Sequence, residues 1–139
     1  MPTDDSRRVE VFRELSGQEC TTRLGGSVIG RIAVCTPDGP VVIPVNYVMD
    51  GESVIVRTAP YGLLAGYAWG LASFEIDAFD DTSRRGWSVL VMGQATPLED
   101  VDEVMSLQLT DKLVAWAPGS RNMFIRITPR SVTGREVGR

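Results

Sequence analysis

The chain has 139 residues, 43% of them hydrophobic and 23% charged, with a net charge of -4. This length suits one domain with its own hydrophobic core, so we expect a single domain over residues 1–139. An acidic chain offers no overall positive field to nucleic acid. No apolar run approaches a membrane span, and the polar N-terminus lacks a signal-peptide core. We therefore expect a cytoplasmic protein that binds neither nucleic acid nor membrane.

The residue inventory also excludes several kinds of active site. The sequence contains no histidine, and its two cysteines, Cys20 and Cys35, have no C-x-x-C spacing. This rules out histidine-containing zinc sites and the Ser-His-Asp and Cys-His nucleophile systems. We expect both cysteines to be reduced, half-buried small hydrophobes. The acidic pairs at 80–81 and 100–102 are typical of turns and helix caps, so no metal site is predicted and no catalytic side chain is assigned.

The N-terminal part predicts a partly flexible segment followed by a capped helix. Residues 1–14 are polar, and the spacing of Val9, Phe12 and Leu15 predicts a short helix that docks one side on the body. Ser16 and Glu19 form a capping-box pattern, which predicts a helix start at this point. That helix should end at Gly25-Gly26.

The next part of the chain predicts an antiparallel meander. Three segments rich in valine and isoleucine are expected to be strands, at 27–35, 41–49 and 53–58. Their linkers, 37–40 and 50–51, have the proline, aspartate and glycine of tight turns. Strands joined this closely favour a barrel or a sandwich over a parallel α/β sheet.

The remaining elements alternate short helices with longer strands. We expect helices at 60–71 and 100–109, and strands at 72–79, 87–98, 123–128 and 131–137. Gly93 is predicted to mark a bulge or a barrel corner. The loop around Trp116 separates the last helix from the last strands. The sum is a mainly β protein of about seven strands and three short helices.

On residue types alone, the polar features of these strands have ordinary explanations. Pro44 within a strand marks an edge or a bulge, and Arg57 at a strand end is a solvated cation. Arg31 predicts a surface or interface ion pair. Trp69 is expected to anchor the core or a dimer interface, since large aromatic side chains favour both.

Seven motifs in a fixed order carry a resemblance to a known family. They are the capped helix at 16–25, Val28-Ile29-Gly30-Arg31-Ile32-Ala33, Pro44-Val45-Asn46-Tyr47, Arg57-Thr58-Ala59-Pro60, Gly86-Trp87-Ser88-Val89, Arg126-Ile127-x-Pro129 and Val132-Thr133-Gly134-Arg135. In this order the chain resembles the pyridoxamine 5'-phosphate oxidase-like FMN-binding split-barrel family, from about Leu15 to Val137.

The resemblance implies a β-barrel with short helices: a six- to seven-stranded antiparallel split barrel that forms a homodimer. It also implies FMN at the subunit interface and a flavin-dependent oxidoreductase acting on a small-molecule substrate. The cofactor-binding residues that it implies are Pro44, Val45, Asn46, Arg57, Thr58, Ala59, Leu63, Leu64, Trp87, Ser88, Trp116 and Arg126. The 44–46 segment would lie along the flavin ring, and Arg57 with Thr58 would take the ribityl chain and phosphate.

One position departs from the family pattern. FMN-binding members commonly have a lysine shortly after the Arg-Thr-Ala-Pro segment, where this chain has Leu63. Three alternatives therefore stay open: weak FMN binding, use of the deazaflavin F420 by a reductase, and a non-catalytic split-barrel binding protein that has lost its cofactor.

Overall fold

A computed structural model describes residues 11–58, 62–67, 69–100, 102–103 and 123–138. Its elements are β1 (Val11–Glu14), α1 (Gly17–Gly25), β2 (Ile29–Thr36), β3 (Gly39–Asp50), β4 (Ser53–Thr58), α2 (Leu63–Tyr67), β5 (Gly70–Asp80), β6 (Arg85–Pro97) and β7 (Met123–Gly138). The predicted mainly β fold with short helices is therefore confirmed.

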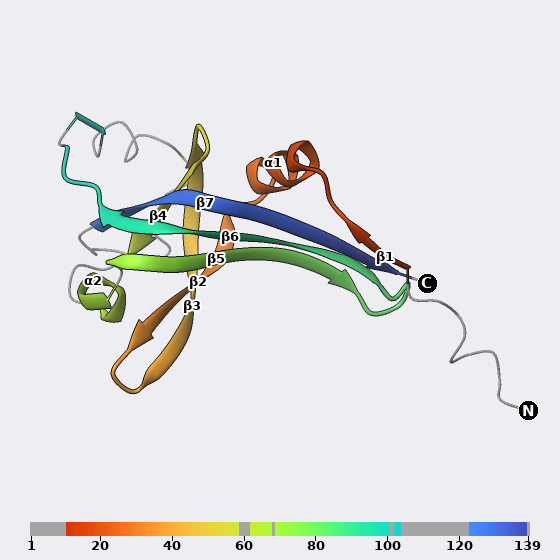
Figure 1. Cartoon of the computed structure of the whole chain (residues 1–139), viewed down its shortest axis with the longest axis horizontal. Helices are drawn as coiled ribbons and strands as arrows, with labels where there is room; N and C mark the ends of the chain where they lie inside the picture. Colours follow the sequence, from red (N-terminus) through yellow and green to blue (C-terminus); the bar gives the residue numbers. More distant parts are fainter. Residues whose placement is uncertain (1–10, 59–61, 68, 101, 104–122, 139) are drawn as a thin grey trace, which may run out of the picture.

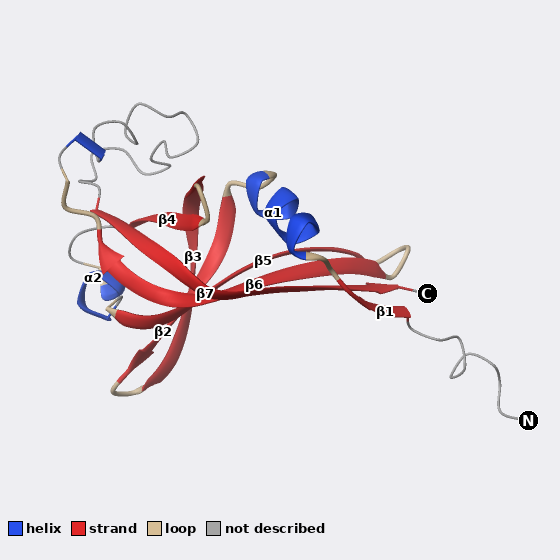
Figure 2. Cartoon of the chain, turned by 45° about the horizontal axis from the view of Figure 1, so that its top comes forward, coloured by secondary structure: helices blue, strands red, loops and turns tan. Residues whose placement is uncertain are grey.

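The strands form one antiparallel sheet that closes on itself. Its order is β1-β7-β4-β3-β2-β5-β6, and β6 also pairs with β7, which makes a ring of all strands but β1. The far parts of β5, β6 and β7 continue past this ring, and β1 pairs with the end of β7 there (Figures 1 and 2). We call this extension the arm. Closure protects strand edges within the barrel.

The barrel interior contains the hydrophobic core. Tyr47 and Phe74 are fully buried, with ring centroids 4.7 Å apart in an edge-to-face arrangement. The Tyr47 hydroxyl donates a hydrogen bond to the Leu24 carbonyl oxygen over 2.5 Å, so the core tyrosine also fixes the end of α1. Because side chains alternate along a strand, Val45 and Tyr47 face this core while Pro44 and Asn46 face outward.

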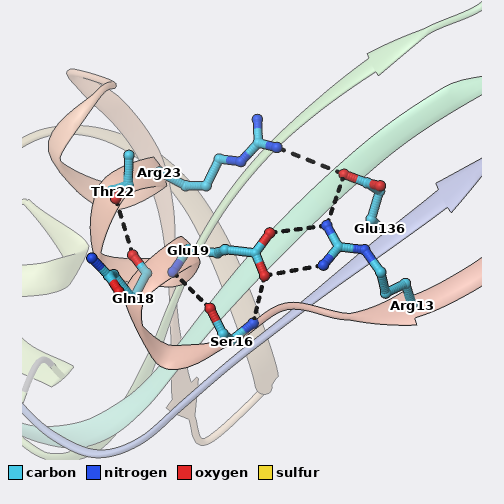
Figure 3. Close-up of polar contacts among 7 residues, drawn as sticks. All are labelled: Arg13, Ser16, Gln18, Glu19, Thr22, Arg23 and Glu136. Atoms are coloured by element: carbon cyan, nitrogen blue, oxygen red, sulfur yellow. Dashed lines mark hydrogen bonds and ion pairs between the residues drawn. The ribbon is translucent and has the colours of Figure 1, made fainter.

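Helix α1 lies against the arm through charged contacts (Figure 3). The predicted capping box is confirmed, since the Ser16 hydroxyl accepts from the Glu19 amide and the Glu19 carboxylate accepts from the Ser16 amide. The Arg13 guanidinium donates to both Glu19 carboxylate oxygens, over 3.0 and 2.9 Å. Glu136 of β7 forms ion pairs with Arg13 and Arg23. The network thus joins β1, α1 and β7.

Two predictions near the chain ends were wrong. Residues 11–14 form strand β1, which pairs with the end of β7, and not part of a helix. The two strands expected at 123–128 and 131–137 are one continuous strand, β7. Pro129 lies inside it, opposite Gly93, where a register shift between Met92 and Gly93 confirms the predicted bulge. Because proline has no amide hydrogen to donate, the bulge allows the β6–β7 pairing to continue on both sides of Pro129.

Other local predictions are confirmed only in part. α2 is shorter than expected, and β5 already begins at Gly70, whose φ of 83° favours glycine. Neither cysteine is half-buried as expected, because Cys20 is buried and Cys35 is exposed. Of the helix expected at 100–109, Asp102 and Glu103 are helical, and the Asp100 carboxylate accepts from the Glu103 amide over 3.1 Å. The rest of that helix lies outside the described residues.

Two absences hold for the described residues. None of their helices is long and apolar enough to cross a membrane. They also contain no cluster of three or more side chains able to hold a metal ion. Asp80 instead accepts hydrogen bonds from the amides of Thr82 and Ser83, the turn role that the sequence predicted.

Candidate cofactor site

The middle of β3 and the end of β4 bring the main predicted site residues together. Asn46 of β3 pairs directly with Arg57 of β4. Pro44 is exposed and Asn46 is half-buried, whereas the side chain of Val45 is buried in the core. One outward face therefore carries the pyrrolidine ring, an amide and a guanidinium, with the main chain of 44–46 along it.

Arg57 supplies the positive charge of this face. Its side chain is half-buried, and burial lowers the pKa of its guanidinium. An arginine nevertheless keeps its charge at neutral pH. Partial desolvation strengthens its attraction for an anion, because the effective dielectric constant is lower away from bulk water. Arg57 therefore has the chemistry of a phosphate ligand.

The structure separates the side chains of Thr58 and Leu64 from this face. Thr58 follows Arg57 in the strand, so its side chain points to the opposite side. Leu64 of α2 is buried in the main core. Leu63 is the first residue of α2, and Ala59 lies outside the described residues. Arg57, and not Thr58 or Leu64, is thus the side chain that this segment presents beside Asn46.

A small apolar cluster continues the same outward face toward β7. Ile55 and Phe124 are buried there, and Val48 and Leu98 pack against them. The Leu98 amide donates to the Phe124 carbonyl oxygen over 2.9 Å, which holds the chain after β6 against β7. Arg57 pairs with Phe124 in the β4–β7 ladder. The guanidinium therefore lies beside an apolar surface.

Arg126 lies further along this face and already has acidic partners. Its guanidinium is 2.9 Å from an Asp50 carboxylate oxygen and 3.7 Å from one of Glu103. Two carboxylates compensate its charge, so Arg126 is a weaker candidate for a cofactor-binding residue than the resemblance implies.

A charged cluster on the other side of Pro44 was foreseen only in part. Arg31 of β2 lies between Pro44 of β3 and Glu75 of β5 in the sheet. Its guanidinium donates to Glu75 over 2.7 Å and also to Asp77. The sequence predicted an ion pair for Arg31 but not its partners. The sequence signal for these partners was the alternation of apolar and polar residues in this strand, which places Glu75 and Asp77 on its solvent-facing side.

The two carboxyl groups of this cluster differ electrostatically. Burial and then the neighbouring Asp77 raise the pKa of Glu75. The pKa of Asp77 is lowered, chiefly by hydrogen bonding with Glu75 and also by Arg31. Of the two, Glu75 holds a proton more readily, and Asp77 stays ionised beside Arg31.

Trp87 and Ser88 lie away from Arg57 within one chain. Both belong to the arm, where Ser88 pairs with Asp77 and Arg135. The Trp87 ring packs under the Arg23 guanidinium of α1, 4.6 Å from centroid to carbon. Trp116 lies outside the described residues. Among the described residues, a single chain therefore brings together Pro44, Asn46 and Arg57, but not Trp87 or Ser88.

The fold defines a small antiparallel barrel of the split-barrel class. The chain matches the family model described as "Pyridoxamine 5'-phosphate oxidase" over residues 16–136. It therefore belongs to the pyridoxamine 5'-phosphate oxidase family, as the order of motifs predicted.

Three similar proteins illustrate the family. The uncharacterized protein Rv0080 of Mycobacterium tuberculosis is 29% identical over 127 residues, which cover 87% of this chain and 82% of the relative. The FAD binding protein from Mycobacterium smegmatis has a TM-score of 0.79 and 29% identity, with 91% and 99% of the chains covered. The conserved protein of unknown function DIP1874 from Corynebacterium diphtheriae has a TM-score of 0.75 and 30% identity, with 91% and 98% covered.

Proposed function

We propose that this protein is a homodimeric, cytoplasmic flavoprotein that uses FMN to oxidise or reduce a small molecule. The observation that carries the proposal is the pairing of Asn46 with Arg57, beside Pro44, on one outward face. The similarity to the FAD binding protein of Mycobacterium smegmatis supports a flavin and makes FAD a second candidate. A bound flavin would supply the hydride or electron transfer.

The residues of the chain would bind and orient this cofactor. The Arg57 guanidinium has the fork geometry to donate two hydrogen bonds to a phosphate. The main chain of 44–46 would lie along the polar edge of the flavin ring, and the Asn46 amide can donate or accept there. In a dimer, residues such as Trp87 would approach this face from the partner subunit.

The direct test is cofactor titration of the wild type and of Arg57→Ala. We expect FMN to quench on binding to the wild type, and Arg57→Ala to weaken binding by about ten- to a hundredfold, the usual effect of losing a charged hydrogen bond. Arg84→Asn removes an exposed cation from the β5–β6 turn and keeps a residue that tolerates its φ of 57°, so it is the matched control.

Parallel titrations with FAD and F420 identify the cofactor. If FAD or F420 binds more tightly than FMN, that molecule replaces FMN as the proposed cofactor. If none of the three binds at high micromolar concentration, the flavoprotein function is wrong and a non-catalytic binding protein is the better description.

Leu63 favours that second function, because a lysine is common at this position in FMN-binding members. The position begins α2, soon after Arg57. We expect Leu63→Lys to tighten FMN binding by about tenfold through one added cationic contact. Leu63→Met is the uncharged control. Equal FMN affinities for both variants, measured by fluorescence, would show that residue 63 does not face the phosphate.

A further inference from the structure

A groove opens on the outer wall of the barrel where β2 and β5 part. Their ladder has three pairs and ends at Ala33 and Ser73. Beyond that point β2 turns away with β3 into a projecting hairpin (Figure 1). The resulting groove has a volume of about 470 Å³, which falls within the range of small-molecule sites.

A row of mostly small side chains crosses the groove. Ala33, Ser73, Met92 and Ser131 are consecutive partners across β2, β5, β6 and β7. Apart from Met92, each member of this row is small, and Gly93 follows Met92 in the lining. A ligand can therefore approach the sheet closely here.

The walls of the groove are apolar and exposed. Leu71 is 66% exposed and Met92 47% exposed. Cys35 and Pro40, which are register partners in the β2–β3 ladder, line the other side. Solvent-exposed apolar side chains that line a groove indicate a surface that binds an apolar molecule. Leucine and methionine are also flexible enough to adapt to such a molecule.

Arg130 supplies the positive charge of this groove. Among the described residues that line it, Arg130 alone is charged. Arg130 is exposed, so it can move to meet a ligand at the edge. In a chain of net charge -4, an apolar groove with one guanidinium selects for a molecule with an apolar body and one acidic group.

We propose that this groove binds a medium-chain apolar anion, such as an alkyl carboxylate, with its chain between Leu71 and Met92 and its acidic group on Arg130. The groove shares no lining residue with the face of Pro44, Asn46 and Arg57. The groove is therefore separate from the proposed flavin site and adds a second ligand site to the protein.

Cys35 provides a reporter within the groove. The chain has two cysteines, and Cys20 is 1% exposed, so a maleimide should label Cys35 first. Mass spectrometry monitors the labelling of Cys35 in the presence of decanoate, at concentrations below its critical micelle concentration. At about ten times its Kd, decanoate should slow the labelling of Cys35 by about tenfold. Decyltrimethylammonium, with the same chain and opposite charge, should leave the rate unchanged.

The variant Arg130→Gln tests the acidic contact. Calorimetry should show decanoate binding about tenfold weaker to this variant, and 1-decanol binding unchanged. Arg84→Asn is the charge-matched control and should bind decanoate as the wild type does. The variant Leu71→Ser should weaken both decanoate and decanol.

Three results would overturn the proposal. The first is no effect of decanoate on the labelling of Cys35, and the second is equal protection by the ammonium compound. The third is protection that needs no ligand and grows with protein concentration, because a second copy of the chain would then cover the groove. None of these measurements uses a flavin, so they leave the test of Arg57 separate.

Discussion

At the scale of single residues, Gly30 is fixed by the aromatic core. A Cβ atom at this position would lie 2.3 and 2.6 Å from two carbons of the Phe74 ring. Phe74 is fully buried against Tyr47, so its ring has no free space to enter. We expect Gly30→Ala to lower the free energy of unfolding by about 1–3 kcal/mol, as overpacked cores do.

Urea unfolding of matched variants checks this expectation. Gly17→Ala is the control, because a Cβ there would meet nothing within 4 Å. It should unfold at or slightly above the urea midpoint of the wild type, since alanine favours a helix. An unchanged midpoint for Gly30→Ala would mean that the Phe74 ring can move aside.

Residue types predicted local contacts better than distant ones. The Ser16–Glu19 capping box spans three positions and was read directly from the sequence. The ion pair of Arg31 was also expected, but its partners Glu75 and Asp77 are 44 and 46 residues away. Those partners depend on the β2–β5 register, which no local pattern specifies.

At the scale of elements, charge holds α1 on the arm. Hydrogen bonds from Arg13 and then from the Ser16 amide lower the pKa of Glu19 from 4.5 to about 2. Its folded pKa is below its unfolded value, so this contribution to stability is present above about pH 4.5 and lost as the pH falls through about 2.

The variant Glu19→Gln tests this coupling, because glutamine keeps the capping box and removes the charge. We expect the variant to be less stable than the wild type at pH 7, and the difference to disappear as the pH approaches 2. Unfolding in urea across this pH range gives the measurement. Glu52→Gln, at the exposed β3–β4 turn, is the control. A difference that does not depend on pH would contradict the charge mechanism.

The prediction of elements failed where pairing decides the structure. The spacing of Val9, Phe12 and Leu15 gave a helical pattern, yet β7 offers residues 11–14 an unpaired edge and they add a strand to it. Pro129 suggested two strands, but the bulge at Gly93 lets β7 continue through it. Both outcomes depend on backbone hydrogen bonds to segments that are remote in the sequence.

At the scale of the whole molecule, the order of motifs predicted the barrel and the face of Pro44 and Arg57. Strand patterns alone left a barrel and a sandwich open, because closure by β6 and β7 is a long-range pairing. The arrangement of Trp87 was beyond sequence reasoning for a similar reason. It lies under Arg23 of α1 in one chain, and any approach to Arg57 requires a second subunit.

The last prediction is that a second subunit binds to form a homodimer. Trp69 precedes β5 and is 58% exposed, and Phe79, near the far end of β5, is 61% exposed. Exposed large aromatic side chains favour an interface, and aromatic anchors near its centre dominate binding energy. We expect sedimentation equilibrium to show a homodimer, and Trp69→Asp to raise its Kd by about thirtyfold or more.

Phe79→Asp is the matched variant, because it introduces the same charge at an equally exposed aromatic position. If Trp69 lies at the interface and the end of the arm does not, only Trp69→Asp gives monomers. The reverse result would place the interface on the arm, whose outer side also carries Phe12, 57% exposed. A wild type that sediments as a monomer at high micromolar concentration would contradict the dimer, and with it the approach of Trp87 from a partner subunit.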